Sequence, residues 1–429
     1  MKISTIPLIC LFLLRPSFLS VQAQDHYLDA EEHAREGLWD SEIATIRMYR
    51  EGWPMSYPIM RLRGDVPLIL EFDDLAEDRS GFQYRIFHCN ADWTLSDISE
   101  QEYLEGYPEN NLPGGTPSFN TYTSYLHYEL SIPNEDLKPL ISGNYLLIVY
   151  QDYDPQKVVL ARRFMVTENS VSIDAKAGVP VLSRFQACCQ EIDFTVRHQG
   201  LLFNDPYSEC HATILQNGVW DMAVEDLPPY QVNPEELIYD YQEENVFPGG
   251  NEFRFFDTKN TRTPTYYVRH IDYIAPFFHF ELKADQLKPA HVYLSSEDIN
   301  GRYAIEAEGG QDPGLDADYV FVHFTLEMPN PLEGEVFLAG ALTNWQFSEQ
   351  NRMRWDASRR AYTLSLLLKQ GVYNYRYLFL PQASSKFDVG EIEGSFFETE
   401  NEYLILFYHR SPSDRYDKLL GHQIVHSNN

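Results

Sequence analysis

The sequence predicts an all-β protein of three consecutive Ig-like, E-set-like β-sandwiches, and three observations indicate this fold class. Aromatic residues make up 14% of the chain. Short runs of alternating apolar and polar residues recur along its whole length, and clusters of Gly, Pro and Asn separate them. Aromatic and β-branched residues favour strands, and many short strands divided by turn signals are typical of sandwiches.

Residues 1–23 have the features of a signal peptide. Lys2 precedes an apolar run over residues 6–14, and Val21 and Ala23 are small or apolar residues of the kind that a signal peptidase reads. No later stretch approaches the roughly 18 continuous apolar residues of a membrane-spanning helix. We therefore expect an exported protein without a transmembrane segment.

The chain is strongly acidic, with a formal net charge of −31. Removal of the signal peptide takes away Lys2 and Arg15 and no acidic residue, so the mature chain is still more negative. Such a chain repels nucleic acid and anionic lipid headgroups and would attract a basic partner surface. Acidity that serves solubility alone is the alternative interpretation.

The first sandwich is expected in residues 24–169. Its predicted strands cover residues 44–49, 57–62, 67–72, 83–89, 125–132, 144–150 and 162–167. The longest connection, residues 90–122, is rich in aromatic residues, and a loop of that length is usually functional or packed on a neighbour. The candidate partner contacts in this loop are Trp93, Tyr103, Tyr107 and Phe119.

The second sandwich is expected in residues 170–308. Its predicted strands cover residues 171–175, 191–196, 212–216, 237–241, 252–257, 266–273 and 278–282. Asn217-Gly218 predicts a hairpin turn, because a type I′ turn needs positive φ at both central positions, and Asn300-Gly301 suggests another.

Pro248-Gly249-Gly250-Asn251 predicts a further turn, between the strands at 237–241 and 252–257. Gly adopts positive φ without steric cost, and Pro fixes φ where the turn begins. This segment is therefore expected to hold two strands and a shaped loop.

A linker is expected over residues 309–318, followed by the third sandwich in residues 319–429. The strands predicted there cover residues 319–326, 335–338, 352–355, 362–368, 373–379 and 403–408.

Four cysteines remain after removal of the signal peptide: Cys89, Cys188, Cys189 and Cys210. Four in a chain of this length make no disulfide framework. An oxidising compartment would permit one bridge, from Cys210 to Cys188 or Cys189, but neighbours on a strand point to opposite faces and at most one of them suits. Cys89 is expected to be a small buried residue.

No catalytic, cofactor-binding or metal-binding residues are predicted, because the sequence lacks G-x-S-x-G, H-E-x-x-H and phosphate-binding Gly loops. Two sets of residues otherwise suggest chemistry. The acidic residues Asp73, Asp74, Glu77, Asp78, Asp312, Asp316 and Asp318 are expected in solvated turns, and the histidines His88, His127, His279 and His323 are expected to pack across strands.

Two segments of the last third, VFLAGALTNWQ (336–346) and LLLKQGVYNYRYLF (366–379), resemble the early Ig-like module of glycogen-binding and starch-branching proteins. In that pattern Trp345 is a core tryptophan rather than a sugar platform. The resemblance leaves glycan binding open as an alternative function.

A second resemblance covers nearly the whole mature chain. Long motifs of aromatic and turn residues occur in order at 45–62, 86–93, 102–110, 143–155, 214–221, 239–257, 297–303, 317–326 and 340–353; they include IFHCNADW, GNYLLIVYQDYDP and YDYQEENVFPGGNEFRFFD. As a set they resemble the type IX secretion system plug protein family. Residues 178–190, with Cys188-Cys189, depart from the family pattern.

The family resemblance implies a non-enzymatic periplasmic protein, peripherally associated with the outer membrane, which plugs the periplasmic opening of a large translocon barrel at rest. It implies no cofactor. Exposed aromatic residues of the 90–122 loop would then anchor the barrel, so Trp93→Ala or Tyr107→Ala is expected to weaken binding without unfolding the protein. A periplasmic or surface glycan-binding protein that uses the C-terminal module is the alternative.

Overall fold

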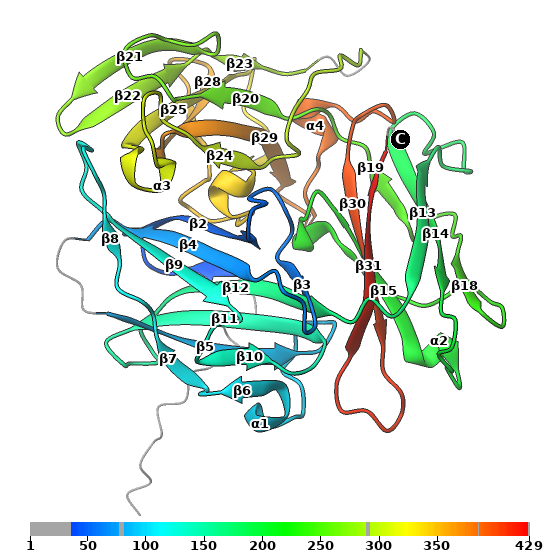
Figure 1. Cartoon of the computed structure of the whole chain (residues 1–429). Coiled ribbons are helices and arrows are strands. Elements are labelled where there is room, and N and C mark those ends of the chain that lie inside the picture. The colour runs from blue at the N-terminus through cyan, green and yellow to red at the C-terminus, as the bar shows by residue number, and fades with distance from the viewer. Residues whose placement is uncertain (1–35, 77–80, 289–291, 385, 428–429) are drawn as a thin grey trace, which may run out of the picture.

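The computed structural model describes residues 36–76, 81–288, 292–384 and 386–427. The expected signal peptide, together with Glu77 and Asp78, lies outside these residues. The described chain is all-β, which confirms the predicted fold class, and its strands form seven sheets. Six of these sheets pair into three sandwiches (Figure 1).

The first sandwich contains the strands between residues 37 and 167. One sheet has the order β1-β12-β11-β5-β7, with β3 beside β12, and the other has the order β2-β4-β9-β8. The strands of the first sheet are β1 (Gly37–Leu38), β3 (Ile59–Arg61), β5 (Phe82–Cys89), β7 (Glu109–Asn111), β11 (Gly143–Gln151) and β12 (Val158–Thr167). Those of the second are β2 (Ile43–Arg50), β4 (Leu68–Asp74), β8 (Thr116–Pro117) and β9 (Leu126–Ile132), and β6 (Leu104–Gly106) pairs separately with β10 (Leu137–Pro139).

The middle sandwich is built from two distant parts of the chain. One sheet contains β13 (Ser172–Gly178), β14 (Cys189–Arg197), β17 (Gln231–Val232), β18 (Glu236–Tyr239) and β19 (Val246–Pro248). The other has the order β16-β15-β30-β31, formed by β16 (Val224–Leu227), β15 (Cys210–Gln216), β30 (Glu402–His409) and β31 (Lys418–His426). In Figure 1 these last two strands, in red, lie beside the green β15.

The third sandwich begins before the expected linker. One sheet contains β20 (Arg254–Asp257), β24 (Tyr303–Ile305), β26 (Gly334–Ala339) and β29 (Gly371–Pro381). The other has the order β21-β22-β25-β28-β27, with β23 beside β25, formed by β21 (Val268–Ile274), β22 (Phe277–Leu282), β23 (Asp285–Gln286), β25 (Tyr319–Glu327), β27 (Arg354–Asp356) and β28 (Ala361–Lys369).

These sheets do not follow the expected boundaries at 308 and 319. Strands β20 to β24 precede the linker in sequence but pair within the third sandwich, and β30 and β31 follow that sandwich but complete the middle one. Pairing between distant strands leaves no local signal in a sequence, so the order of the strands alone suggested three consecutive units.

The Pro248-Gly249-Gly250-Asn251 segment joins two sandwiches instead of two paired strands, since β18 belongs to the middle sandwich and β20 to the third. Gly249 is needed by close packing, because a Cβ there would lie 1.9 Å from the carbonyl oxygen of Phe396. The Asn217-Gly218 turn is confirmed, with φ of 52° and 76°. A short 3₁₀ helix, η1 (Trp220–Met222), separates this turn from β16.

A shared apolar core joins the first and middle sandwiches. Leu146 and Ile148 of β11, which point away from the first sandwich's own core, pack with Leu404 and Leu406 of β30. The alternate residues of β30, such as Ile405, enter the core of the middle sandwich. Both strands therefore lie between two apolar layers, which explains their continuous apolar sequences.

A buried ion pair joins the first and third sandwiches. Nζ of Lys369 lies 2.6 Å from Oδ2 of Asp73, and both side chains are almost fully buried. The same carboxylate accepts hydrogen bonds from the Tyr319 hydroxyl at 2.6 Å and is paired with Nδ1 of His127 at 2.7 Å. The prediction of a solvated turn was therefore wrong for Asp73, and also for Asp74, which is fully buried at the end of β4.

The described helices are short: α1 (Glu100–Tyr103), α2 (Pro206–Glu209), α3 (Pro313–Asp316), α4 (Gly390–Glu393) and the 3₁₀ helices η1 and η2 (Ala341–Thr343). Among the described residues we find no helix with the length and apolar character needed to cross a membrane. The expected linker contains α3, where the Leu315 carbonyl accepts a hydrogen bond from Phe119 N at 2.9 Å. It is thus packed against the first sandwich.

Candidate functional site

Trp93 lies inside the seam between the first and middle sandwiches. Its side chain is 2% exposed, and its ring meets that of Trp220 edge to face, with 5.0 Å between the centroids. The Arg163 guanidinium carbon lies 4.3 Å from the centroid of the Trp93 ring, a cation–π contact. Trp93 is therefore a packing residue, and the expectation of an exposed anchor at this position was wrong.

Tyr103, at the end of α1, is also buried. Its hydroxyl donates to the carbonyl of Ile86 at 3.3 Å, and its ring packs near those of His88 and Tyr145. His88 in turn hydrogen-bonds Ser96 and the carbonyl of Ser142, as a packing histidine would. Because Tyr103 is buried, a partner cannot contact its side chain in the folded protein.

Tyr107 and Phe119 are exposed, at 70% and 71%, but lie apart. Tyr107 follows β6, and its amide donates to the carbonyl of Asp136. Phe119 follows β8 and lies against α3 of the third sandwich. Figure 1 shows β6 at the bottom of the first sandwich and β8 at its left edge, so these residues belong to two separate surfaces.

Phe119 belongs to a surface that the sequence did not reveal. Tyr122, three residues later, contacts Tyr273 and Phe278 of the β21–β22 hairpin, with centroids 5.4 and 5.2 Å apart. Phe119, Tyr122 and Tyr273 are all at least half exposed, and we call these three residues the apolar patch. The patch unites a loop of the first sandwich with a hairpin of the third.

Asp318 holds the loop of the apolar patch on the third sandwich. Its Oδ1 accepts hydrogen bonds from the amides of Tyr122 at 2.6 Å and Thr123 at 3.2 Å. The Tyr125 hydroxyl donates to the carbonyl of Ala317 at 2.9 Å. Burial raises the pKa of Asp318, and these amides oppose the shift. The patch is therefore a preformed surface, although the sequence suggested that Asp318 lies in a solvated turn.

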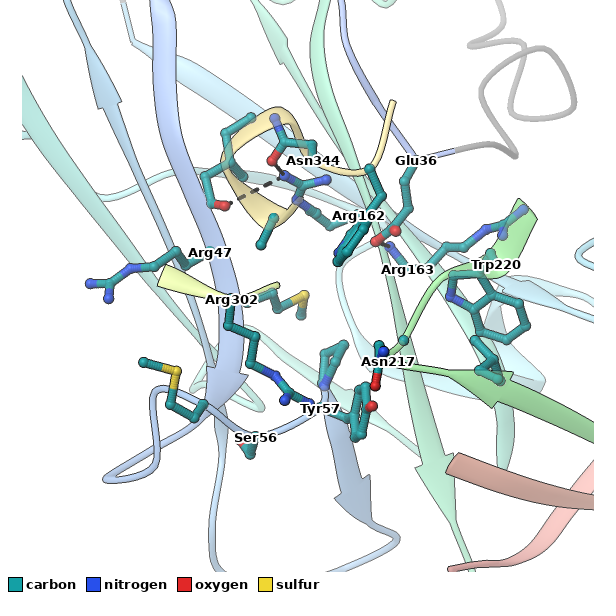
Figure 2. Close-up of a pocket in the computed structure, with 18 of the residues that line it drawn as sticks. Glu36, Arg47, Ser56, Tyr57, Arg162, Arg163, Asn217, Trp220, Arg302 and Asn344 are labelled. Carbon is teal, nitrogen blue, oxygen red and sulfur yellow. Dashed lines mark hydrogen bonds between the residues drawn. The ribbon is translucent and has the colours of Figure 1, made fainter. Parts of the chain in front are cut away.

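A cavity of about 180 Å³ lies where the three sandwiches meet (Figure 2). Four arginines from two sandwiches contribute to its wall: Arg47, Arg162, Arg163 and Arg302. So much positive charge in one place is unexpected in a chain with a net charge of −31. Each arginine makes its own contacts, which determine what the cavity can do.

Acidic groups or carbonyls already engage three of these arginines. Arg47 Nη2 lies 2.5 Å from the Glu71 carboxylate, and Arg302 of the third sandwich pairs with Glu402 of the middle sandwich. Arg162 donates to the side-chain carbonyl of Asn344 on the third sandwich, as Figure 2 shows.

The pKa values follow from these pairs. Burial alone would lower the pKa of Arg302, but Tyr57 and Glu402 raise it above its ordinary value. For Arg163, burial prevails over the nearby acids and lowers the pKa. Because its arginines are already engaged, the cavity is better suited to holding three sandwiches in register than to capturing an anion.

Two groups of side chains in the described part of the chain bring three potential cation ligands together. In one, Glu71, His127 and Glu129, the Glu71 carboxylate is engaged by Arg47 and by the Tyr49 hydroxyl, so a metal ion would compete with an existing cation. The other consists of Glu191, Asp193 and Asp240. Acidic clusters alone do not establish a metal site, and we assign none.

Trp345 offers no open platform for a sugar ring. Its ring packs edge to face against Phe253, with centroids 6.1 Å apart, and a Cβ at Gly301 would lie 2.6 Å from the indole. The Arg376 guanidinium lies 5.8 Å from its centroid. Trp345 is thus engaged within the protein, as expected of a core tryptophan rather than a sugar platform.

Comparisons with known proteins give two findings. Residues 43–168 match the family described as "Type 9 secretion system plug protein 1st domain". A solved structure, the crystal structure of a hypothetical protein from Parabacteroides merdae ATCC 43184, is similar over 91% of this chain and 98% of that one, with 32% sequence identity and a TM-score of 0.88. No curated protein matches the sequence.

Proposed function

The chain belongs to the type IX secretion system plug protein family, and from that premise we propose that it closes the periplasmic opening of the system's outer-membrane translocon barrel at rest. In this proposal the protein is periplasmic, is held peripherally at the outer membrane, and acts as a stopper without catalysis. Its partner is the large barrel itself.

The observation that carries the proposal is the shared core between the first and middle sandwiches. Domains linked in one chain move relative to one another unless their interface is large and hydrophobic. Here buried residues such as Leu146, Leu215 and Leu406 fill the seam. The Asp73–Lys369 pair and the arginine cavity attach the third sandwich to the same body. A body of this kind keeps its shape when it closes a wide opening.

The apolar patch is the proposed contact with the barrel. Exposed aromatic side chains on a preformed surface are typical anchors of protein interfaces, where a few residues provide most of the binding energy. Three such residues form a small surface, and a small contact suits a stopper that must leave when the barrel opens. Tyr107 is a second, separate candidate contact.

The test is a pull-down of the tagged mature protein from detergent-solubilised outer membranes that contain the barrel. We expect the wild type to recover it. The variant Phe119→Ser/Tyr122→Ser/Tyr273→Ser is expected to recover at least tenfold less barrel than the wild type. A tenfold loss corresponds to about 1.4 kcal/mol of binding free energy. Its thermal melt should be close to that of the wild type, since these side chains are largely exposed.

The matched control removes exposed aromatic residues elsewhere. Tyr207 and Tyr230 lie on the middle sandwich, are more than half exposed, and are absent from the patch. Tyr207→Ser/Tyr230→Ser is expected to recover the barrel as the wild type does. Failure of the wild type to recover any barrel would refute the plug role; equal recovery by the patch variant would refute the assigned contact and make Tyr107→Ala the next variant.

A further inference from the structure

Cys188 and Cys189 form a pair that the periodicity of a strand does not predict. Side chains of neighbouring strand residues point to opposite faces, but only Cys189 belongs to β14. Cys188 ends the preceding turn, where its amide and that of Cys189 both donate to the carbonyl of Phe185, at 3.2 and 3.0 Å. Cys188 thus lies in a turn and not in the strand, so the opposite-face rule does not apply to this pair.

The two sulfur atoms are in direct contact. Their Sγ atoms lie 2.6 Å apart, which is longer than the roughly 2.05 Å of a disulfide bond but places the two free thiols in direct contact. The other two described cysteines lie elsewhere: Cys89 packs in the core shared by the first two sandwiches, and Cys210 in the core of the middle one. Each of these two is almost fully buried, whereas Cys188 is only half-buried.

The turn that carries the pair contacts two other parts of the chain. The Cys188 carbonyl accepts hydrogen bonds from the amide of Gly249 at 2.8 Å and from the hydroxyl of Ser395 at 2.7 Å. The neighbouring Ala187 carbonyl accepts one from the amide of Phe397 at 3.2 Å. Gly249 belongs to the segment that leads into the third sandwich, and residues 395–397 lead out of it. The pair therefore lies at the seam between the middle and third sandwiches.

We infer that Cys188 and Cys189 are a redox-active vicinal dithiol, which oxidation closes into a disulfide between neighbouring residues and which then holds this seam in place. Neither cysteine pairs with Cys210. The site does not depend on the plug role and requires only that the protein meets an oxidising compartment, as the expected signal peptide implies.

The chemistry is thiol–disulfide exchange with a small-molecule or protein disulfide as the oxidant. The more accessible Cys188 thiolate attacks one sulfur of the oxidant, and one oxidant thiol leaves. Cys189 then attacks Sγ of Cys188 and releases the second thiol. The pair loses two protons and two electrons, and the oxidant's disulfide becomes two thiols.

The order of attack follows from the environment of each thiol. Burial raises the pKa of Cys189 to about 12, with Cys188 adding to the shift. The thiolate is the nucleophile, so Cys189 reacts second, when Cys188 is already activated as a mixed disulfide.

The test begins with the purified mature chain incubated with oxidised glutathione, alkylated under denaturing conditions without reductant, and digested with trypsin. Cleavage after Arg184 and Arg197 yields a peptide of residues 185–197 that contains both cysteines and no third. We expect this peptide unlabelled and lighter by two hydrogen atoms, with Cys89 and Cys210 labelled. Reduction before alkylation should label all four cysteines.

Two further readouts test the pair as a unit and its effect on the seam. The reduced protein should bind phenylarsine oxide, which needs two neighbouring thiols; Cys188→Ser should lose this adduct, and the control Cys210→Ser should keep it. Amide hydrogen exchange at Gly249 and Phe397 should be several-fold faster in the reduced form than in the oxidised form, with no change in β11 of the first sandwich.

The inference fails if the 185–197 peptide is alkylated without reduction, or if it is recovered bridged to the peptide that contains Cys210. It also fails if the oxidised and reduced proteins exchange equally at Gly249 and Phe397, because the disulfide would then not hold the seam. The peptide map uses the wild-type protein alone, so misfolding of a substituted protein cannot change its outcome.

Discussion

Trp93 and Tyr107 illustrate the two roles that an aromatic residue in a long loop can have, packing inside the protein and exposure on its surface. The Trp93 ring lies between Trp220 and the Arg163 guanidinium inside the seam, whereas Tyr107 of the same loop is exposed. The two residues therefore respond differently to truncation, and Trp93→Ala is expected to disturb the fold before it disturbs any contact with a partner.

We predict that Trp93→Ala lowers the free energy of unfolding by about 3–5 kcal/mol, because truncating a buried tryptophan leaves a cavity. Tyr107→Ala is the control and should change it by less than about 0.5 kcal/mol, since surface substitutions are usually within that range. Urea denaturation followed by tryptophan fluorescence and circular dichroism measures both. If both substitutions lowered the free energy of unfolding by the same small amount, the Trp93 side chain would be open to solvent.

A second residue-scale prediction concerns Asp193 on β14. Burial raises its pKa from 3.8 to about 6, with the neighbouring Glu191 and Asp240 adding to the shift. A raised pKa means that the fold favours the protonated acid, so the stabilising contribution is complete below about pH 4 and is lost as the pH rises through 6.

Asp193→Asn should remove this dependence, because the amide stays neutral at every pH. We expect the stability of the wild type relative to the variant to fall between about pH 4 and about pH 7 and then to level off. Chemical denaturation of both proteins at several pH values in this interval measures the difference. A difference that is constant with pH would contradict the raised pKa.

At the scale of the elements, β4 and β28 meet through the charge pair of Asp73 and Lys369. Burial lowers the pKa of Lys369, and Asp73 opposes this shift. Gly314 of α3 adds a carbonyl acceptor 2.6 Å from Nζ. The pair thus fixes two sandwiches and the α3 segment at one point.

Lys369→Met is expected to lower the free energy of unfolding by about 3–5 kcal/mol, because it leaves the Asp73 carboxylate buried without its cation. The double variant Asp73→Asn/Lys369→Met should recover most of this loss, since it buries no charge at the site. A double-mutant cycle, measured by denaturant unfolding, gives the coupling free energy between Asp73 and Lys369. No recovery in the double variant would mean that packing, not charge, determines the loss.

Sequence patterns were enough to locate many of the strands. Alternation located the strands that became β2, β4, β5, β9, β11 and β12, because the period of a strand is a local property. The continuous apolar runs of β11 and β30 carried a further signal, since a strand that is apolar on both sides is buried on both faces. Recognising it would have predicted the shared core between the sandwiches.

At the scale of the whole molecule, the shared core predicts cooperative unfolding. Leu406 of β30 is fully buried between the first and middle sandwiches. Leu406→Ala is expected to lower the free energy of unfolding by about 2–5 kcal/mol. Both sandwiches should still unfold in one common transition, at a lower temperature than in the wild type. Differential scanning calorimetry of the wild type and the variant measures it. Two separate transitions, of which only one moves, would contradict a shared core.

The candidate contact surface was only partly predictable. The sequence indicated Phe119 as an aromatic loop residue, but Tyr122 and Tyr273 join it only because the loop of the first sandwich folds onto the β21–β22 hairpin. The arginine cavity was not predicted at all, since its arginines come from distant parts of the chain, at residues 47, 162–163 and 302, and line one cavity only in the assembled molecule.

The sequence by itself determined the all-β class, the position of most strands and the type IX secretion plug family, because alternation, turn residues and long motifs are properties of neighbouring residues. Only the tertiary structure decided that β30 and β31 complete the middle sandwich, that Trp93 is buried while Tyr107 is exposed, and that the Cys188 and Cys189 thiols meet. These outcomes depend on which distant surfaces pack together, and the free energy of that packing is shared among residues that no local pattern connects.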